Sequence, residues 1–498
     1  MSVLDERWIC DVQSIGTHAT APPSVVVAGL FSDFSATASA GDTALRENCG
    51  STGSDVASLT PVFAGALFEI AIGTVSWLGA LVRVVVVGLG ERATFGPQLL
   101  RSVSAVAARA IRQSGSAGVL SLLALELPDS AGVSAAIEGH LLGGWAYQRA
   151  GGAPSAARTF TVAIPDDVVV PEAIVARARL TAGATNWVRQ LVESPPNLLG
   201  PVQFADAVER LAREVAPGKV TVKRWGVGLM AERGFGGTLG VGAGSATAPL
   251  VIELSAGSGI PLGLAGKGIT FDSGGINLKR SASDLSWMKS DMAAAASIAA
   301  AVVTSAALGS MQAMHAILPV AENMPGAGAQ RPGDVVTHPG GRTTEITDTD
   351  NEGRLVLADA IAWLASTAPV AIIDVGTLTD SGAVGTEYWG CWTTAPLLAA
   401  AVVAAGERAG DNGWILPLHD SYDSLISSRV ADVANSPLDV VDTGQLAAIY
   451  LRGFAGSTPW VHVDNGSGAW LERDSGAWAA GPTGTPLRAL IEYLAPSV

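Results

Sequence analysis

The sequence predicts an α/β protein with two domains, in which sheets are flanked by helices. Three observations favour this fold class. The chain has 498 residues, more than one ordinary domain holds. Hydrophobic residues make up 48% of it, enough for large buried cores, and 59 glycines supply the turns that connect short elements. Short apolar runs alternate with longer helical patterns along most of the chain, which is typical of sheets covered by helices.

The smaller, N-terminal domain is predicted to cover residues 1–165. Residues 83–90 are a β-branched run that ends in glycines, the pattern of a buried strand. An Ala- and Leu-rich stretch over 97–113 predicts a helix, and a second apolar run over 119–125 predicts another strand. This order of elements indicates an α/β unit of its own.

The larger, C-terminal domain is predicted to cover residues 166–498. Its first helix is expected over 174–193 and ends before the prolines at 195 and 196, which cannot continue a helix. Helical patterns then alternate with short strand patterns, so we expect a mixed, largely parallel sheet flanked by helices. The strands are predicted at residues 220–223, 250–254, 313–319, 370–375 and 460–463.

Charge, hydropathy and cysteine content exclude several classes of partner and compartment. The formal net charge is −15 and no segment is rich in Lys or Arg, so we expect no binding to nucleic acid or to anionic membranes. Residues 292–308 are uncharged, but Ala, Ser and Thr dominate them, which favours a buried helix over a membrane span. Cys10, Cys49 and Cys391 lie far apart, and the N-terminus has no signal-peptide pattern. A reducing, cytoplasmic location is therefore expected.

Lysines and carboxylates are the best candidates for chemistry. The six histidines form no HExxH pair, and no serine lies in a GxSxG turn. One cluster contains Lys267, Asp272, Lys279 and Asp291. Because Lys267 lies between glycines in an apolar run, we expect its amine to lose its proton more easily than usual, above all beside a dication. An ordinary strand-end lysine and a turn aspartate would explain this segment alone equally well.

A second cluster contains Asp348, Asp350, Glu352 and Arg354. In an extended segment residues two apart point to the same side, so the last three would face one site. Carboxylates this close repel one another, and divalent cations relieve the repulsion; a bridging carboxylate places two ions about 3.5–4 Å apart. The alternative is a solvated acidic loop. It is weakened by the apolar residues 355–364, which predict a buried helix directly after the cluster.

A calcium-binding EF-hand is another alternative for residues 348–359. Its acidic residues and Gly353 fit much of that loop. However, Asp359 occupies the twelfth place, where Glu is usual. The preceding residues 338–347 are β-like and broken by glycines where an entering helix is required. We therefore do not expect an EF-hand.

Together, the two clusters resemble the leucine aminopeptidase (cytosol aminopeptidase) family of metallopeptidases. The segments GKGITFDSGG at 266–275 and EGRLVLADA at 352–360 match that family's signatures nearly letter for letter. The similarity continues at 375–379, 414–418 and 460–470. It implies a metal-dependent aminopeptidase that removes N-terminal residues from short peptides. It also implies a separate, macro-like N-terminal domain and a homo-hexamer.

The resemblance further implies a role for each site residue. The residues expected to hold one metal ion are Lys267, Asp272, Asp291 and Glu352. Those expected to hold the other are Asp272, Asp350 and Glu352. Lys279 would polarise the scissile carbonyl, and Arg354 would hold a bicarbonate that acts as general base. The two divalent ions are expected to be manganese or zinc. The residues expected in the substrate pocket are Met288, Asn351, Thr377 and Asp380.

The chain departs from the usual residues of that family around the site. Asp348 stands where Asn is usual, Asn351 where Ala is usual and Asp380 where Gly is usual. Ala293 and Ala294 replace two glycines. No expected metal ligand is changed, so we expect effects on substrate preference and turnover more than on the fold. The alternatives to a general aminopeptidase are a narrowed dipeptide or biosynthetic substrate, or a low-activity hexameric binding scaffold.

Overall fold

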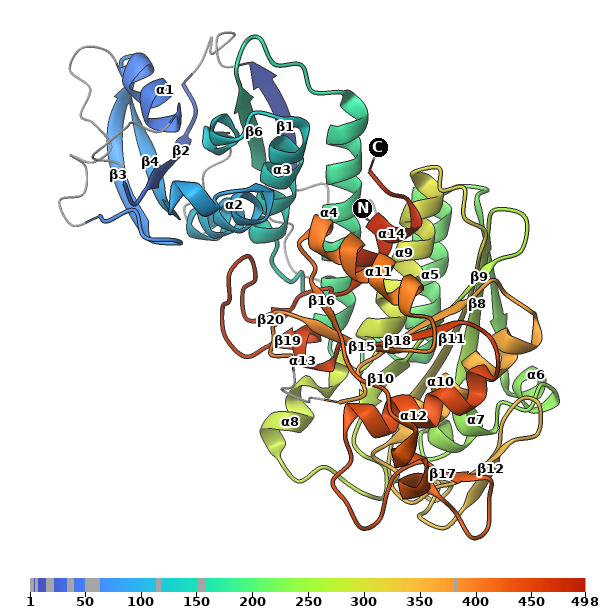
Figure 1. The fold of residues 1–498 in the computed structure, drawn as a ribbon. Helices are drawn as coiled ribbons and strands as arrows, with labels where there is room; N and C mark the ends of the chain where they lie inside the picture. The colour runs from blue at the N-terminus through green and yellow to red at the C-terminus, as the bar shows by residue number, and fades with distance from the viewer. Residues whose placement is uncertain are drawn as a thin grey trace. The chain divides into compact units, whose positions relative to one another are not determined.

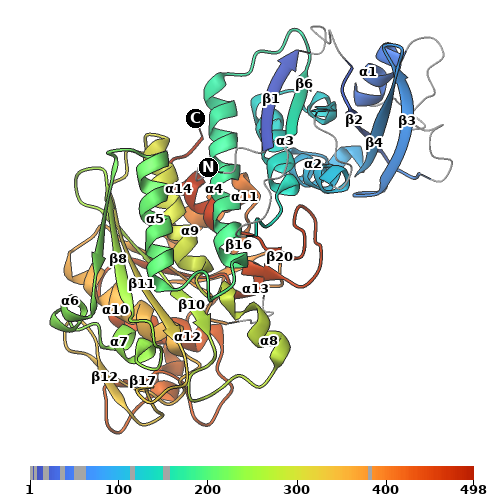
Figure 2. The same ribbon diagram turned by 180° about the vertical axis from the view of Figure 1, so that it is seen from behind.

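The structure, a computed structural model, describes residues 4, 8–14, 22–33, 40–49, 63–112, 118–149, 158–379 and 384–497. It forms two compact units (Figures 1 and 2). Unit 1 comprises Met1–Asn186 and Glu472–Ala480, and unit 2 comprises Trp187–Leu471 and Gly481–Val498. The chain therefore passes from unit 1 to unit 2 within helix α4 (Glu172–Glu193), and it returns to unit 1 for residues 472–480. The domain boundary that the sequence places between residues 165 and 166 stays a prediction.

Unit 1 is an α/β fold around a six-stranded sheet, counted over the described residues, with strand order β1-β6-β5-β2-β4-β3. Neighbouring strands are parallel except for the antiparallel β3–β4 pair. Helices α2 and α3 pack on one face and α1 on the other. The strands are β1 (Trp8–Ser14), β2 (Val25–Phe31), β3 (Ile70–Trp77), β4 (Ala80–Gly90), β5 (Gly118–Ser121) and β6 (Arg158–Ile164). The helices are α1 (Ala40–Cys49), η3 (Arg92–Thr94), α2 (Pro97–Arg112), η4 (Leu123–Glu126) and α3 (Ser130–Gly144).

The strand and helix expected over 83–90 and 97–113 are confirmed as β4 and α2, with residue 113 outside the described residues. The strand expected over 119–125 is wrong in its second half. There β5 ends at Ser121, where its pairing with β2 also ends, and the chain turns into the 3-10 helix η4. The apolar residues of both pieces are buried. Periodicity cannot distinguish a buried strand from a buried helical turn in so short a run.

Within the described part of the chain, unit 2 is built on a nine-stranded mixed sheet with the order β16-β15-β18-β14-β9-β11-β8-β7, in which β10 also pairs with β11. The five predicted strands of this unit are all present. The strands are β7 (Val220–Trp225), β8 (Leu250–Ala256), β9 (Leu262–Gly266), β10 (Gly268–Asp272), β11 (Met314–Asn323), β14 (Ile372–Gly376), β15 (Trp389–Thr393), β16 (Gly413–Ile415) and β18 (Trp460–Asp464). Two small sheets contain β12 (Val335–Thr337), β13 (Thr343–Glu345) and β17 (Val433–Ala434), and β19 (Trp470–Leu471) and β20 (Gly481–Pro482).

Two helical layers cover the sheet of unit 2 (Figures 1 and 2). Helices α5 and α9, with α14 against α9, lie on one face, and α7, α10 and α12 lie on the other. The helices are α5 (Pro201–Val215), α6 (Val227–Glu232), α7 (Gly236–Gly242), α8 (Ala282–Trp287), α9 (Ala293–Ala307), α10 (Glu352–Ser366), α11 (Pro396–Ala409), α12 (Gly444–Ala455), α13 (Gly466–Ala469) and α14 (Leu487–Leu494). The 3-10 helices are η5 (Met288–Ser290) and η6 (Asp420–Ile426).

Helix α9 lies unusually close to the sheet. A Cβ atom added at Gly266 would lie 2.7 Å from the Cα of Ala295, and one at Gly268 would lie 3.3 Å from the Ala295 side chain. Only small residues permit this approach, which accounts for the alanine-rich sequence of the helix. Within the described residues, the stretch Ala282–Ala307 is long and apolar enough to cross a membrane, but 94% of its apolar window is buried inside the fold. The prediction of a buried helix here is confirmed.

Candidate metal centre

Four chain segments place the predicted site residues together in unit 2. Lys267 lies at the break between β9 and β10, where its backbone N–H donates to the carbonyl of Val375 on β14. Asp272 is the last residue of β10. Asp291 follows the 3-10 helix η5 and lies two residues before α9, and Glu352 is the first residue of α10. The ends of two strands and the beginnings of two helices therefore meet at one place.

Two lysines link four carboxylates. Lys267 Nζ lies 2.7 Å from Asp291 Oδ1 and 2.8 Å from Glu352 Oε1. Lys279 Nζ lies 2.7 Å from Asp272 Oδ2 and 2.6 Å from Asp350 Oδ1. Each ammonium group thus bridges carboxylates from two different segments. The sequence predicts that these residues share one site. It does not predict which carboxylates each lysine contacts.

Asp272, Asp350 and Glu352 form the acidic core of the site, with one oxygen from each lying within 4.8 Å of the others. Burial, together with the charges of Asp272 and Glu352, raises the pKa of Asp350 to about 7. The pKa of Glu352 is also raised, first by burial and then by Asp272. Negative charge is therefore concentrated where little water can solvate it, and a cation would stabilise it.

Lys267 does not behave as its sequence context predicts. Burial alone lowers the pKa of its amine, as expected. The neighbouring carboxylates of Asp291 and Glu352 outweigh burial, so the pKa of Lys267 is raised above its usual value. The sequence showed the apolar run around the lysine but not the two anions that fold brings to it.

The site contains buried carboxylate oxygens without hydrogen-bond partners among the described residues, and such oxygens are suited to bind a divalent cation. Asp291 Oδ2 and Glu352 Oε2 are buried and have no hydrogen-bond partner among the described residues. Buried carboxylate oxygens are almost always paired, and hard oxygen donors are the ligands that such ions prefer. Asp291 is held in place by Thr377, whose Oγ1 donates to Asp291 Oδ1 over 2.7 Å.

Two buried asparagines to which the sequence analysis assigns no role hold the acidic segments. Asn323, at the end of β11, donates from Nδ2 to Asp272 Oδ1. Asn435 donates from Nδ2 to the carbonyl of Asp348 over 2.6 Å and accepts the N–H of Thr347 at its Oδ1 over 2.8 Å. The only available signal for the first was its position four residues after the predicted strand at 313–319. Nothing in the sequence places Asn435 beside the turn at 347–351.

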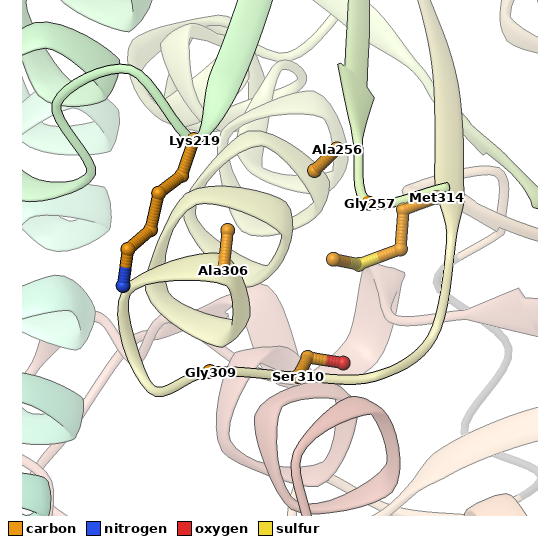
Figure 3. Close-up of a pocket in the computed structure, with 7 residues that line it drawn as sticks. All are labelled: Lys219, Ala256, Gly257, Ala306, Gly309, Ser310 and Met314. Atoms are coloured by element: carbon orange, nitrogen blue, oxygen red, sulfur yellow. The ribbon is translucent and has the colours of Figure 1, made fainter.

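The described residues also line a cavity of about 300 Å³ elsewhere in unit 2 (Figure 3). Ala306, Gly309 and Ser310 place it at the C-terminal end of α9, with Lys219 at its rim. Asp291 precedes the other end of the same helix. At a rise of about 1.5 Å per residue, the helix separates the two places by roughly 20 Å. The cavity is therefore not part of the acidic site.

Comparison with known proteins assigns both parts of the chain to one family. A model of the cytosol aminopeptidase family, catalytic domain, matches residues 186–491, and a model of the same family's N-terminal domain matches residues 37–150. The chain belongs to the cytosol aminopeptidase family. It is a metal-dependent aminopeptidase, a metallo-exopeptidase of the hydrolase class.

Individual relatives of this aminopeptidase agree with the assignment. A probable cytosol aminopeptidase of Solibacter usitatus is 38% identical over 82% of this chain and 85% of its own length. A probable cytosol aminopeptidase of Streptomyces coelicolor is 37% identical over 82% of this chain and 83% of its own length. Among solved structures, the bottromycin maturation enzyme BotP is 31% identical, with a TM-score of 0.81 over 95% of this chain and 99% of that one. BotP has also been solved in complex with Mn. The alternatives of a narrowed substrate or a binding scaffold are not favoured.

The two departures next to the acidic core shape a turn of this aminopeptidase. Asp348 Oδ1 accepts the backbone N–H of Asp350 over 2.9 Å, and its Oδ2 accepts Nδ2 of Asn351 over 3.2 Å. Asn351 in turn accepts Nη2 of Arg354 at its Oδ1 over 2.9 Å. Arg354 also donates from Nη1 to the carbonyl of Asn435 over 2.6 Å. Both substitutions therefore act on the orientation of Asp350 and Arg354.

The residues predicted to line the substrate pocket lie on separate elements. Met288 is the half-buried first residue of η5, Asn351 precedes α10 and Thr377 follows β14. Asp380 lies outside the described residues. The grouping of these residues into one pocket stays a prediction.

Proposed function

We propose that two divalent ions, manganese or zinc, bind at this site. The ligands of the first would be Lys267, Asp272, Asp291 and Glu352. Those of the second would be Asp272, Asp350 and Glu352. The observation that carries the proposal is the crowding of the three acidic-core oxygens within 4.8 Å, together with the buried Asp291 Oδ2 and Glu352 Oε2, which have no hydrogen-bond partner among the described residues. Two such metal ions, when bound, would supply a site for a neutral substrate amine and an activated water.

The chain's own cations assist the hydrolysis of short peptides at their N-terminal residue. Lys279 is held at the acidic core by Asp272 and Asp350, where its charge can stabilise the oxyanion that forms on the scissile carbonyl. Arg354, in the first turn of α10, holds an anion that accepts a proton from the attacking water. Bicarbonate is the anion that the family resemblance implies.

The assembly, location and partners complete the proposal. We infer a cytoplasmic homo-hexamer that acts on peptides and binds neither nucleic acid nor membranes. The net charge of −15 supports the absence of nucleic acid, because phosphate contacts need clustered cations. The names of the relatives support the location.

Hydrolysis of leucine p-nitroanilide and of short peptides tests the function, with manganese or zinc added and after treatment with a chelator. We expect activity that is lost on chelation and restored by either ion, and two metal equivalents per chain by elemental mass spectrometry. The Asp350→Asn variant should retain fewer equivalents, whereas Asp439→Asn, at an exposed position, should retain both. Full activity in metal-free protein would contradict the proposed mechanism.

A further inference from the structure

Arg354 has a negatively charged partner within the protein itself. Its side chain is 1% exposed, and its Nη2 lies 2.7 Å from Oδ2 of Asp442. Among the described residues, Asp442 is the only carboxylate within ion-pair distance of this guanidinium. A buried guanidinium needs such a partner, because an unpaired charge is poorly tolerated away from water.

Asp442 is held in this position by its own neighbours. Its Oδ1 accepts the N–H of Thr443 over 2.9 Å, and its Oδ2 accepts Oγ of Ser436 over 3.2 Å. Thr443 caps the N-terminus of α12. Ser436 is buried, and its backbone N–H donates to Thr347 Oγ1 over 3.1 Å. Both ends of the segment are therefore fixed, although residues 438–441 between them are exposed.

A free anion would have to compete with this carboxylate. To bind Arg354, it must displace Asp442 or lie beside it, and two like charges at one guanidinium repel each other. A side chain that is already in place does not lose the translational freedom that a free ion loses on binding. The protein's own anion therefore has the advantage at Arg354.

We propose that the anion which Arg354 presents to the reaction is the Asp442 carboxylate, in place of a free bicarbonate. This inference rests on the proposed aminopeptidase chemistry. Asp442 accepts a proton from the attacking water while the water oxygen bonds to the carbonyl carbon. The same proton passes to the leaving nitrogen as the carbon–nitrogen bond breaks, which restores the carboxylate.

The test measures how activity and anion binding depend on bicarbonate in the full-length, zinc-loaded enzyme. Peptide hydrolysis is followed in buffer freed of carbon dioxide and again with added bicarbonate. Binding of 13C-labelled bicarbonate is followed separately by NMR line width, a readout that does not require turnover. The variants are Asp442→Asn, Asp442→Glu and, as a matched control in the same segment, Asp439→Asn.

We expect the wild type and Asp439→Asn to change less than about twofold on addition of bicarbonate and to bind none. Asp442→Asn should lose about a hundredfold in the bicarbonate-free buffer, the usual contribution of a general base, and should bind bicarbonate and recover part of its rate. Asp442→Glu keeps the charge and should remain independent of bicarbonate, which also shows that the segment tolerates substitution.

Two results would overturn the inference. One is saturable binding of bicarbonate to the wild type with the same affinity as to Asp442→Asn. The other is an Asp442→Asn enzyme that keeps its full rate without bicarbonate. Failure of the proposed function is distinguishable from both, because it would appear as a wild type that releases no amino acid with either metal while the NMR measurement still reports the occupancy of Arg354.

Discussion

The side-chain amide of Asn323 joins two parts of the acidic site: its Nδ2 donates to Asp272 Oδ1 over 2.7 Å and to the carbonyl of Thr349 over 3.0 Å. Asn323 is 1% exposed and ends the central strand β11. Asp272 ends the neighbouring strand, and Thr349 directly precedes Asp350. One buried amide thus fixes the separation between two proposed metal ligands that are far apart in the sequence.

Replacing this amide should weaken metal binding. In Asn323→Ala we expect the affinity for manganese and the value of kcat/KM to fall about 10–100-fold, the usual effect of losing a group that orients a ligand. Calorimetric titration with manganese measures the affinity directly. Asn197→Ala, at an exposed asparagine, is the control. An unchanged affinity in Asn323→Ala would show that Asp272 needs no such support.

Lys279 should affect the reaction more than the metal content. The Lys279→Met variant keeps the length of the side chain but loses the charge that stabilises the oxyanion, so we expect kcat to fall about 10²–10³-fold. Metal content should be retained, because the ammonium group competes with the ions for Asp272 and Asp350. Steady-state kinetics with elemental analysis separates the two effects. Lys223→Met, with a 64% exposed side chain, serves as the control, and a loss of metal in Lys279→Met would refute this role.

Gly353 leaves the space that Lys267 occupies. A Cβ atom at this position would lie 2.4 Å from Lys267 Cε and 2.6 Å from its Nζ. We therefore expect Gly353→Ala to displace the lysine, to lose at least one metal equivalent and to destabilise the metal-free protein by about 1–3 kcal/mol through overpacking. Calorimetric unfolding and metal analysis check both effects. Gly228→Ala, where a Cβ meets nothing within 4 Å, should show neither.

His140 in unit 1 should make the protein sensitive to acid. Burial lowers its pKa from 6.5 to about 3, and its Nε2 lies 2.8 Å from Ser121 Oγ. Because the folded-state pKa lies below that of the unfolded chain, the stability that neutral His140 contributes is present above pH 6.5 and is lost as the pH falls toward 3. The loss amounts to about 2 kcal/mol at pH 5. Unfolding of unit 1 in His140→Gln should depend less on pH between 7 and 5, as circular dichroism would show; an equal slope in both proteins would contradict this.

Sequence reasoning found the residues that lie inside two compact motifs. Lys267, Asp272 and Glu352 could be predicted because their neighbours are glycines and apolar residues in fixed order, so local pattern alone marks them. Asn323 and Asn435 could not, since each reaches the site only through the pairing of strands or the contact of distant segments. Asp442 was missed for the same reason: it follows exposed residues and only the fold brings it to Arg354.

The same distinction between local pattern and distant contacts explains which parts of the fold could be predicted. Strands such as β14 and β18 are recognisable because their apolar runs are bounded by turn residues. The run at 119–125 failed because burial, which the sequence shows, is common to β5 and η4, whereas the partner strand that distinguishes them is not local. The reversed pKa of Lys267 has the same origin, because its counter-charges come from other segments.

The contact of Ala295 with Gly266 and Gly268 makes the joint between α9 and the sheet mechanically stiff. Where backbone meets backbone, no soft side chain can absorb a change in spacing. Asp291 lies just before that helix, and Lys267 lies between those two glycines. The packing of the helix against the sheet therefore fixes the distance between these two residues. The packing of α9 against the sheet should therefore help to determine which ionic radius the site prefers. A larger residue at position 295 should change this preference, although it replaces no metal ligand.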